Sequence, residues 1–137
     1  MDLYSRRIVG WAMDAHLEGS LVEGALKMAI RQRDPGSDLL HHSDRGSQYA
    51  CNDYQDLLKA HGILLSMSRT GNCYDNAVIK NFFDTLKTEL IHHCSYPTRN
   101  QAKHNLFEYI EVFYNRERIH SPLGYLSPQD CEDLWSN

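Results

Sequence analysis

Hydrophobic and polar positions along this chain alternate with two different periods. Residues 7–13, Arg-Ile-Val-Gly-Trp-Ala-Met, are rich in strand-forming residues and follow a polar turn, so they predict a strand that starts partway through a hairpin. From Ser20 to Arg33 apolar residues recur at helical spacing, with Ser20 as the expected N-cap and residues 34–36, Asp-Pro-Gly, as the stop. The first quarter of the chain therefore predicts a strand followed by a helix.

The next segment predicts a strand, a helix and a second strand in close succession. Residues 38–42 form the first strand, residues 52–60 form a helix that ends near Gly62, and residues 63–67 form the second strand. This order is typical of a βαβ unit, whose strands are parallel and joined by a right-handed crossover. The pattern indicates an α/β protein.

The second half of the chain predicts two longer helices. The polar residues 68–75 indicate a loop, after which a helix continues to about residue 93. Thr98 and Gln101 have the spacing of a capping box for a last helix that runs to about Arg116. The prolines and glycine within residues 120–128 predict a surface loop before a short terminal turn.

Length and composition limit the chain to one domain and to certain partners. Its 137 residues, 42% of them hydrophobic, suffice for one core and not for two. Because the net charge is -4, any contact with DNA must come from local basic clusters. No apolar run approaches the length of a membrane span, which predicts a soluble protein with no membrane partner.

Cysteine and histidine usage predicts a cytoplasmic protein with reduced thiols. The cysteines are scattered, without a Cys-x-x-Cys pair, and no export signal is present. One cluster could be imagined as a zinc site: His41, His42, His92, His93 and Cys94. Adjacent residues on a strand point to opposite faces, and the spacing of structural zinc sites is missing, so the pattern disfavours zinc.

Asp44 is the first candidate for chemistry. It follows a predicted strand, the place where open α/β sheets present catalytic groups, and Arg45 and Gln48 supply hydrogen-bond donors beside it. The alternative is a plain Asp-Arg-Gly turn with no ligand. The residues alone leave both interpretations open.

Two further segments have the composition of nucleic-acid contacts. Arg69, Asn72 and Asn76 stand among small residues, which suits contacts to phosphate and sugar oxygens and equally suits a solvated loop. Residues 114–120, Tyr-Asn-Arg-Glu-Arg-Ile-His, combine cations with an aromatic ring, which is compatible with nucleic-acid binding. The aromatic residues here also have the helical spacing of a core face.

Four ordered motifs together resemble the integrase-core transposases of bacterial insertion sequences, which belong to the DDE superfamily of retroviral-integrase-like proteins. They are residues 2–13 (DLYSRRIVGWAM), 42–49 (HSDRGSQY), 66–77 (SMSRTGNCYDNA) and 109–125 (YIEVFYNRERIHSPLGY). The resemblance implies an α/β ribonuclease-H-like fold, a three-layer sheet flanked by helices. On this resemblance residues 1–128 are expected to be an N-terminally incomplete integrase core, and residues 129–137 a C-terminal tail.

The resemblance also implies an active site of three carboxylates, Asp, Asp and Glu, that hold two Mg²⁺ or Mn²⁺ ions. Hard ions of this kind take oxygen ligands and activate the attacking and leaving oxygens at phosphorus. The family's second Asp falls on Asp44, as a catalytic residue and metal ligand. The family's Glu follows with 35 residues between, and this sequence has Lys80 there.

An ammonium group at residue 80 opposes metal binding. It has no lone pair, and at about 4 Å from a divalent ion it is repelled by something on the order of 8 kcal/mol before relaxation. Glu89 cannot substitute, because nine helical residues carry it more than about 10 Å away. The family's first Asp is expected upstream of the segment that begins at Asp2, so Lys80→Glu alone is not expected to restore activity.

The sequence thus predicts a transposase segment that is inactive by itself. The alternatives are a module that binds DNA or full-length transposase and inhibits transposition, or an inert gene remnant. Expected partners are transposon-end and target DNA and a second copy or full-length transposase, in a bacterial cytoplasm and at the nucleoid when DNA is bound. The residues expected to contact DNA are Arg45, Gln48, Arg69, Asn72, Asn76, Lys87, Arg116 and Arg118, and Lys80 could add a phosphate contact.

Overall fold

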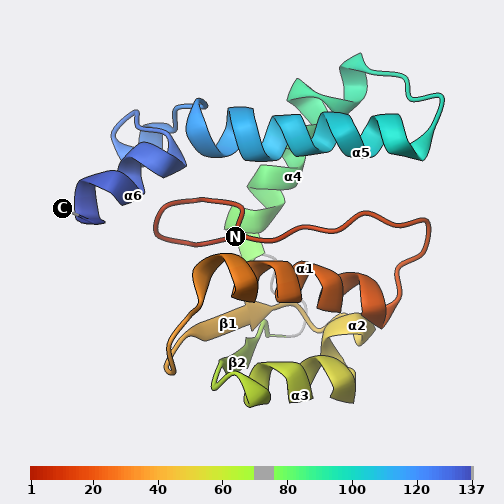
Figure 1. Cartoon of the computed structure of the whole chain (residues 1–137), viewed down its shortest axis with the longest axis vertical. Helices are drawn as coiled ribbons and strands as arrows, with labels where there is room; N and C mark the ends of the chain where they lie inside the picture. The colour runs from red at the N-terminus through yellow and green to blue at the C-terminus, as the bar shows by residue number, and fades with distance from the viewer. Residues whose placement is uncertain (70–75, 137) are drawn as a thin grey trace. The chain divides into compact units, whose positions relative to one another are not determined.

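A computed structural model describes residues 1–69 and 76–136 (Figure 1). These residues divide into two compact units. Unit 1 comprises Met1–Ile8 and Asn81–Asn137, and unit 2 comprises Val9–Lys80. Residue Asn72, one of the predicted DNA contacts, lies outside the described residues.

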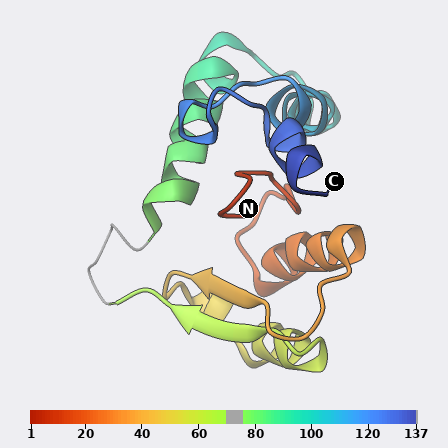
Figure 2. The same cartoon turned by 90° about the vertical axis from the view of Figure 1, so that its left-hand side faces the viewer.

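Unit 2 contains a parallel pair of strands joined through helices. The strands are β1 (Leu40–Ser43) and β2 (Leu64–Met67), with Leu40 opposite Leu64 and Ser43 opposite Met67. Figure 2 shows the two arrows side by side. Between them lie α2 (Ser47–Ala50) and α3 (Asn52–Ala60). The predicted strand–helix–strand order and its parallel pairing are confirmed, although α2 was not predicted.

The core of unit 2 brings residues from three elements together. Leu26 comes from α1 (Gly19–Arg33), Tyr54 and Leu58 come from α3, and Ile63 immediately precedes β2. Leu58 is 1% exposed. This apolar contact packs the crossover helix against the residue that leads into β2.

The strand predicted for residues 7–13 is wrong. Residues 6–14 have no regular secondary structure, and the segment runs on without a ladder partner among residues 1–69 and 76–136. Strand propensity measures how well side chains fit a pleated, half-buried surface, so it does not by itself supply a partner strand. Gly10 instead lies against α1, where an added Cβ would collide with the carbonyl oxygen of Ala25.

The start of α1 also differs from the prediction. The helix begins at Gly19, so Ser20 lies inside it, and the N-cap residue Glu18 makes no side-chain capping bond. The predicted stop is confirmed, because Asp34 adopts a left-handed conformation with φ 42° and donates its N–H to Ile30. The predicted N-cap therefore lies two residues after the observed one.

Unit 1 is helical. It contains α4 (Ala77–Glu89) from Asn81 onward, the 3₁₀ turn η2 (Ile91–His93), α5 (Arg99–Phe107), the π-helical segment η3 (Glu108–Tyr114), the 3₁₀ turn η4 (Ser121–Leu123) and α6 (Pro128–Ser136). Thr98 caps α5 by accepting from the Gln101 N–H at 3.2 Å, as predicted. The widening of this helix into a π-segment at Glu108 was not predicted.

The predicted short terminal turn is wrong, since α6 is nine residues long. Its signal is readable in the sequence: Ser127 accepts from the Asp130 N–H at 3.1 Å and donates its hydroxyl to the Asp130 carboxylate at 2.8 Å. Pro128 fits the first helical position, where no N–H is needed. The helix spans the predicted domain boundary at 128/129, and that boundary stays a prediction.

Candidate functional site

Asp44 immediately follows β1 and is exposed. Its Oδ1 accepts from the Gly46 N–H at 2.8 Å, which closes a tight turn before α2. The structure therefore combines both interpretations of this residue, a turn and a carboxylate at the end of a strand. Burial raises the pKa of the nearby Tyr49 hydroxyl, and the negative charge of Asp44 raises it further.

Ser68 joins the ends of the two strands and was not among the predicted site residues. It follows β2, is 4% exposed, and donates its N–H to the Ser43 carbonyl at 2.8 Å. Its own carbonyl accepts from Arg45 Nε at 2.8 Å. Ser68 is thus bonded to the backbone of Ser43 and to the side chain of Arg45, the two residues that flank Asp44.

The Ser68 hydroxyl also contacts a histidine and the start of α4. Asn76 Nδ2 donates to Ser68 Oγ at 2.5 Å, and His42 Nε2 lies 3.1 Å from the same oxygen. On the other side of its ring, His42 Nδ1 lies 3.0 Å from Ser66 Oγ. A signal for this cluster exists, because Ser66 and Ser68 alternate on one strand face and Ser66 is in register with His42.

Lys80 is exposed in the first turn of α4. It stands four residues after Asn76, which immediately precedes the helix. The bond from Asn76 to Ser68 joins the start of α4 to the strand ends beside Asp44. The position where the family resemblance expects a glutamate is therefore about one helical turn from this junction.

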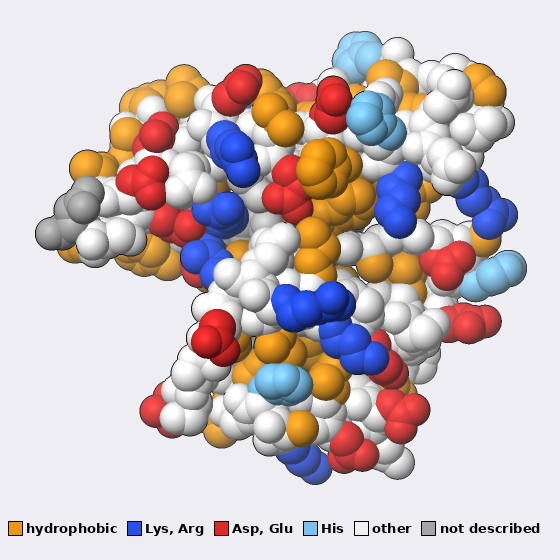
Figure 3. Space-filling view, in the orientation of Figure 1, with side chains coloured by type: hydrophobic (Ala, Val, Ile, Leu, Met, Phe, Trp, Pro, Cys, Tyr) orange, Lys and Arg blue, Asp and Glu red, His pale blue; other side chains and the backbone are white. Residues whose placement is uncertain are grey.

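The remaining predicted contacts differ in their surroundings. Arg45 and Arg69 are exposed in unit 2, and Gln48 is half-buried in α2, where its carbonyl accepts from the Cys51 thiol. Lys87 and Arg116 are exposed in unit 1. On the face drawn in Figure 3, Lys and Arg side chains are interspersed with Asp and Glu side chains, in keeping with the net charge of -4.

Arg118 is engaged within unit 1. Its Nε and Nη2 donate to the Glu89 carboxylate at 2.7 to 3.0 Å, and the Tyr109 hydroxyl donates to the same carboxylate at 2.7 Å. The Arg118 hydrogen bonds hold the pKa of Glu89 below its ordinary value, and the same bonds raise the pKa of Arg118. Burial, followed by the bond to Glu89, raises the pKa of Tyr109.

This ion pair predicts acid sensitivity in unit 1. Since the folded pKa of Glu89 is depressed, its contribution to stability is complete above the ordinary glutamate pKa and is lost as the pH falls through the depressed value. Urea unfolding between pH 7 and pH 3 is expected to show a fall in the free energy of unfolding that Glu89→Gln reduces. Arg118→Ala should flatten the profile in the same way, and an unchanged profile in both variants would contradict this.

Both tyrosines of the 109–120 segment are core residues, whereas Phe113 is exposed. Tyr109, Ile110 and Tyr114 are buried, and the Tyr114 ring packs edge-on against Phe82 with centroids 5.0 Å apart. The His120 ring also packs edge-on against Tyr114, with centroids 4.9 Å apart. This segment therefore offers DNA only the residues at its surface, such as Arg116.

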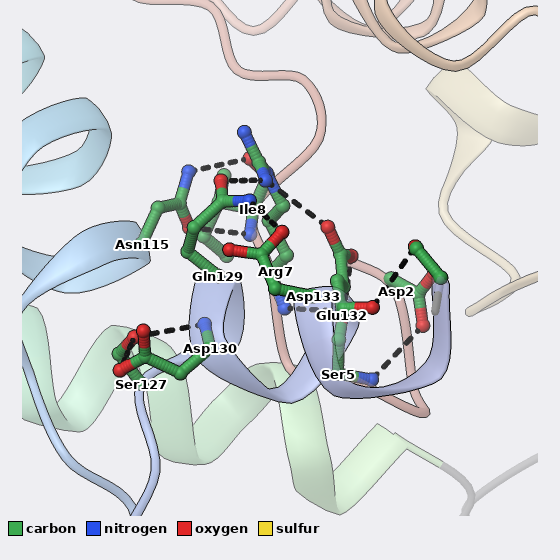
Figure 4. A network of polar contacts seen from close by, with 11 residues as sticks. Asp2, Ser5, Arg7, Ile8, Asn115, Ser127, Gln129, Asp130, Glu132 and Asp133 are labelled. Atoms are coloured by element: carbon green, nitrogen blue, oxygen red, sulfur yellow. Dashed lines mark hydrogen bonds and ion pairs between the residues drawn. The ribbon is translucent and has the colours of Figure 1, made fainter.

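Asn115, in the same segment, is fully buried and holds the start of the chain. Its Oδ1 accepts from the Ile8 N–H at 2.9 Å, and its Nδ2 donates to the Ile8 carbonyl at 3.0 Å (Figure 4). Nearby, Arg7 donates to Glu132 at 3.0 Å and to Gln129 at 2.5 Å. Residues 1–8 are thereby bound to the C-terminal helices of unit 1.

The described residues contain neither a metal-binding cluster nor a membrane-spanning helix. No group of three His, Cys, Asp or Glu side chains that could hold a metal ion occurs in residues 1–69 and 76–136. Within the same residues, no helix has the length and apolar character needed to cross a bilayer.

Comparison with known proteins defines the class. Two models of the integrase core domain match residues 1–73 and residues 80–133. The chain belongs to the integrase core domain family. A chain of the simian T-cell lymphotropic virus intasome, solved in complex with PP2A regulatory subunit B56 gamma, matches 86% of this chain and 41% of its own length, with a TM-score of 0.68 and 16% identity. This match shows the ribonuclease-H-like integrase fold.

Particular relatives are insertion-sequence proteins. The transposase for IS904 of Lactococcus lactis is 44% identical over 132 residues, which are 96% of this chain and 52% of the relative. An uncharacterized 31 kDa protein of IS600 from Shigella sonnei is 47% identical over 93% of this chain and 47% of its own length. The transposase InsF for IS3A of Escherichia coli is 43% identical over 97% of this chain and 46% of its own length. The chain thus spans about half the length of the curated relatives it matches.

Proposed function

We propose that this chain is a DNA-binding integrase core of an insertion-sequence transposase that lacks a working metal site of its own. The observation that carries the proposal is Lys80, about one helical turn after the Asn76–Ser68 bond that joins the start of α4 to the strand ends. A lysine there can contact a phosphate but cannot ligate a divalent ion. The transposases among its relatives support DNA as the partner.

The donor set near Asp44 does not fit a divalent metal. Proteins of the DDE type use divalent metal in general, and such ions need several oxygen ligands. Asp44 is exposed, and one of its carboxylate oxygens accepts a hydrogen bond from the Gly46 N–H. Lys80 adds an exposed positive charge in the first turn of α4, which favours an anionic partner such as a phosphate.

The proposed DNA contacts are the cationic side chains whose charged nitrogens are exposed and can bind a phosphate. Arg45 is anchored only through Nε in the bonds described above, so both of its terminal nitrogens can face DNA. Lys80, Lys87 and Arg116 are exposed. Arg118 makes a weaker candidate, because a phosphate would have to displace the Glu89 carboxylate.

Salt dependence of DNA binding tests the proposal. The logarithm of the association constant should fall linearly with the logarithm of salt concentration, by about 0.9 for each phosphate neutralised. Lys80→Ala should reduce that slope by about 1. Lys59→Ala, which removes the same charge from the exposed surface of α3, is the matched control and should leave it unchanged.

The outcomes separate clearly in a fluorescence anisotropy titration with a labelled transposon-end duplex. A slope that responds to Lys80→Ala and not to Lys59→Ala supports the proposed interface. Undetectable or salt-independent binding would overturn it, as would equal effects of the two lysine variants.

A further inference from the structure

Every polar group of Ser68 is hydrogen-bonded, to Ser43 and Arg45 beside Asp44, to His42, or to Asn76 just before α4. Its N–H and its hydroxyl both donate to the Ser43 carbonyl, at 2.8 and 3.2 Å, and its carbonyl accepts from Arg45 Nε. Asn76 donates to the hydroxyl oxygen. A single buried residue therefore connects the strand end, through its backbone and hydroxyl, with Arg45, through its carbonyl, and with Asn76 just before α4, through its hydroxyl.

The Ser68 hydroxyl makes all three hydrogen bonds that a serine hydroxyl can make. A serine hydroxyl has one hydrogen and two acceptor lone pairs. The hydrogen points to the Ser43 carbonyl, so the lone pairs accept from Asn76 Nδ2 and from an Nε2–H of His42. His42 Nδ1 then accepts from the Ser66 hydroxyl. No other serine on these strands makes a bond to α4 in the described residues.

We infer that Ser68 is a positioning residue for DNA binding, an inference that rests on the proposed function. The Ser68 carbonyl holds Arg45 by its Nε, which leaves the two terminal nitrogens for a phosphate. The Ser68 hydroxyl accepts one hydrogen of the Asn76 amide, which leaves the other N–H and the amide oxygen for the DNA backbone. Side chains held in place before binding lose less conformational freedom when DNA arrives. Ser68 itself is buried and touches no DNA.

A double-mutant cycle on DNA affinity tests this role. Ser68→Ala is expected to weaken binding about threefold to tenfold, the range that one lost hydrogen bond can produce. If Ser68 acts through Asn76, the double variant Ser68→Ala with Asn76→Ala should lose clearly less than the product of the two single losses. Ser68→Thr keeps the hydroxyl and should recover most of the affinity.

Ser66→Ala is the matched control. It removes a hydroxyl from the same strand face, two residues earlier, and that hydroxyl bonds to His42 without reaching α4. Its effect on DNA affinity should stay within about twofold and should combine additively with that of Asn76→Ala. Ser68→Cys, which has a similar shape and a weaker hydrogen-bonding group, replaces Ser68→Ala in the cycle if the alanine variant does not fold.

The outcomes distinguish this inference from the proposed function. Coupling of Ser68 with Asn76, without coupling of Ser66 with Asn76, supports the positioning role. Additive losses in a chain that binds DNA would overturn the positioning role alone. Absence of DNA binding by the unsubstituted chain would overturn the proposed function and this inference with it.

Discussion

Purified protein is expected to leave transposon-end DNA intact in the presence of Mg²⁺ or Mn²⁺, with neither strand cleavage nor strand joining. A two-metal phosphoryl transfer needs carboxylates that hold ions against both the attacking and the leaving oxygen. An ammonium about 4 Å from a divalent ion is repelled by something on the order of 8 kcal/mol before relaxation. An energy of that size corresponds to roughly a millionfold in an equilibrium constant.

The measurement is a gel assay with labelled transposon-end oligonucleotides and each metal in turn. The IS904 transposase of Lactococcus lactis, assayed with its own ends, serves as the positive control. Asp44→Asn should give the same blank result as the unsubstituted chain. Metal-dependent cleavage that disappears in Asp44→Asn would contradict the prediction, because it would show that Asp44 supports catalysis despite Lys80.

Elements with a strong local signal could be predicted from the sequence. The helix at residues 52–60 is observed over those residues, since its apolar face and Gly62 mark both its core contact and its end. The parallel pairing of β1 with β2 followed from their connection through a helix. These features depend on residues that lie close together in the sequence.

Features that depend on distant partners could not be predicted in the same way. Residues 7–13 have strand-forming side chains, yet a strand exists only where another strand pairs with it. The π-segment at Glu108–Tyr114 keeps an apolar stripe that an α-helix would also have, so its wider turn leaves no clear pattern. Both errors concern backbone pairing that periodicity does not specify.

The candidate site was predicted in part for the same reason. Asp44 was placed at a strand end by local pattern, and its position there is confirmed. The role of Ser68 depends on the register between two strands, which the sequence does not state. Arg118 looked like a phosphate contact because its partner, Glu89, lies 29 residues away in the sequence. A cluster of cations alone does not reveal which cations are already paired.

Asn115→Ala is expected to lower the free energy of unfolding by about 3 kcal/mol. The side chain is 0% exposed and bonds to both backbone groups of Ile8, a residue 107 positions away. Its removal leaves a buried N–H and a buried C=O without partners, and each costs about 1–3 kcal/mol. Urea unfolding followed by far-ultraviolet circular dichroism measures the loss.

Two further variants separate this hydrogen bonding from a general effect of substitution. Asn100→Ala changes the same residue type at an exposed position of α5 and should stay within about 0.5 kcal/mol of the unsubstituted chain. Asn115→Asp preserves the shape but replaces the amide nitrogen with an oxygen that faces the Ile8 carbonyl, so it should destabilise as strongly as alanine. If Asn115→Asp were as stable as the unsubstituted chain, the donated bond to Ile8 would contribute nothing, and the docking of residues 1–8 would depend on Arg7 and Glu132 instead.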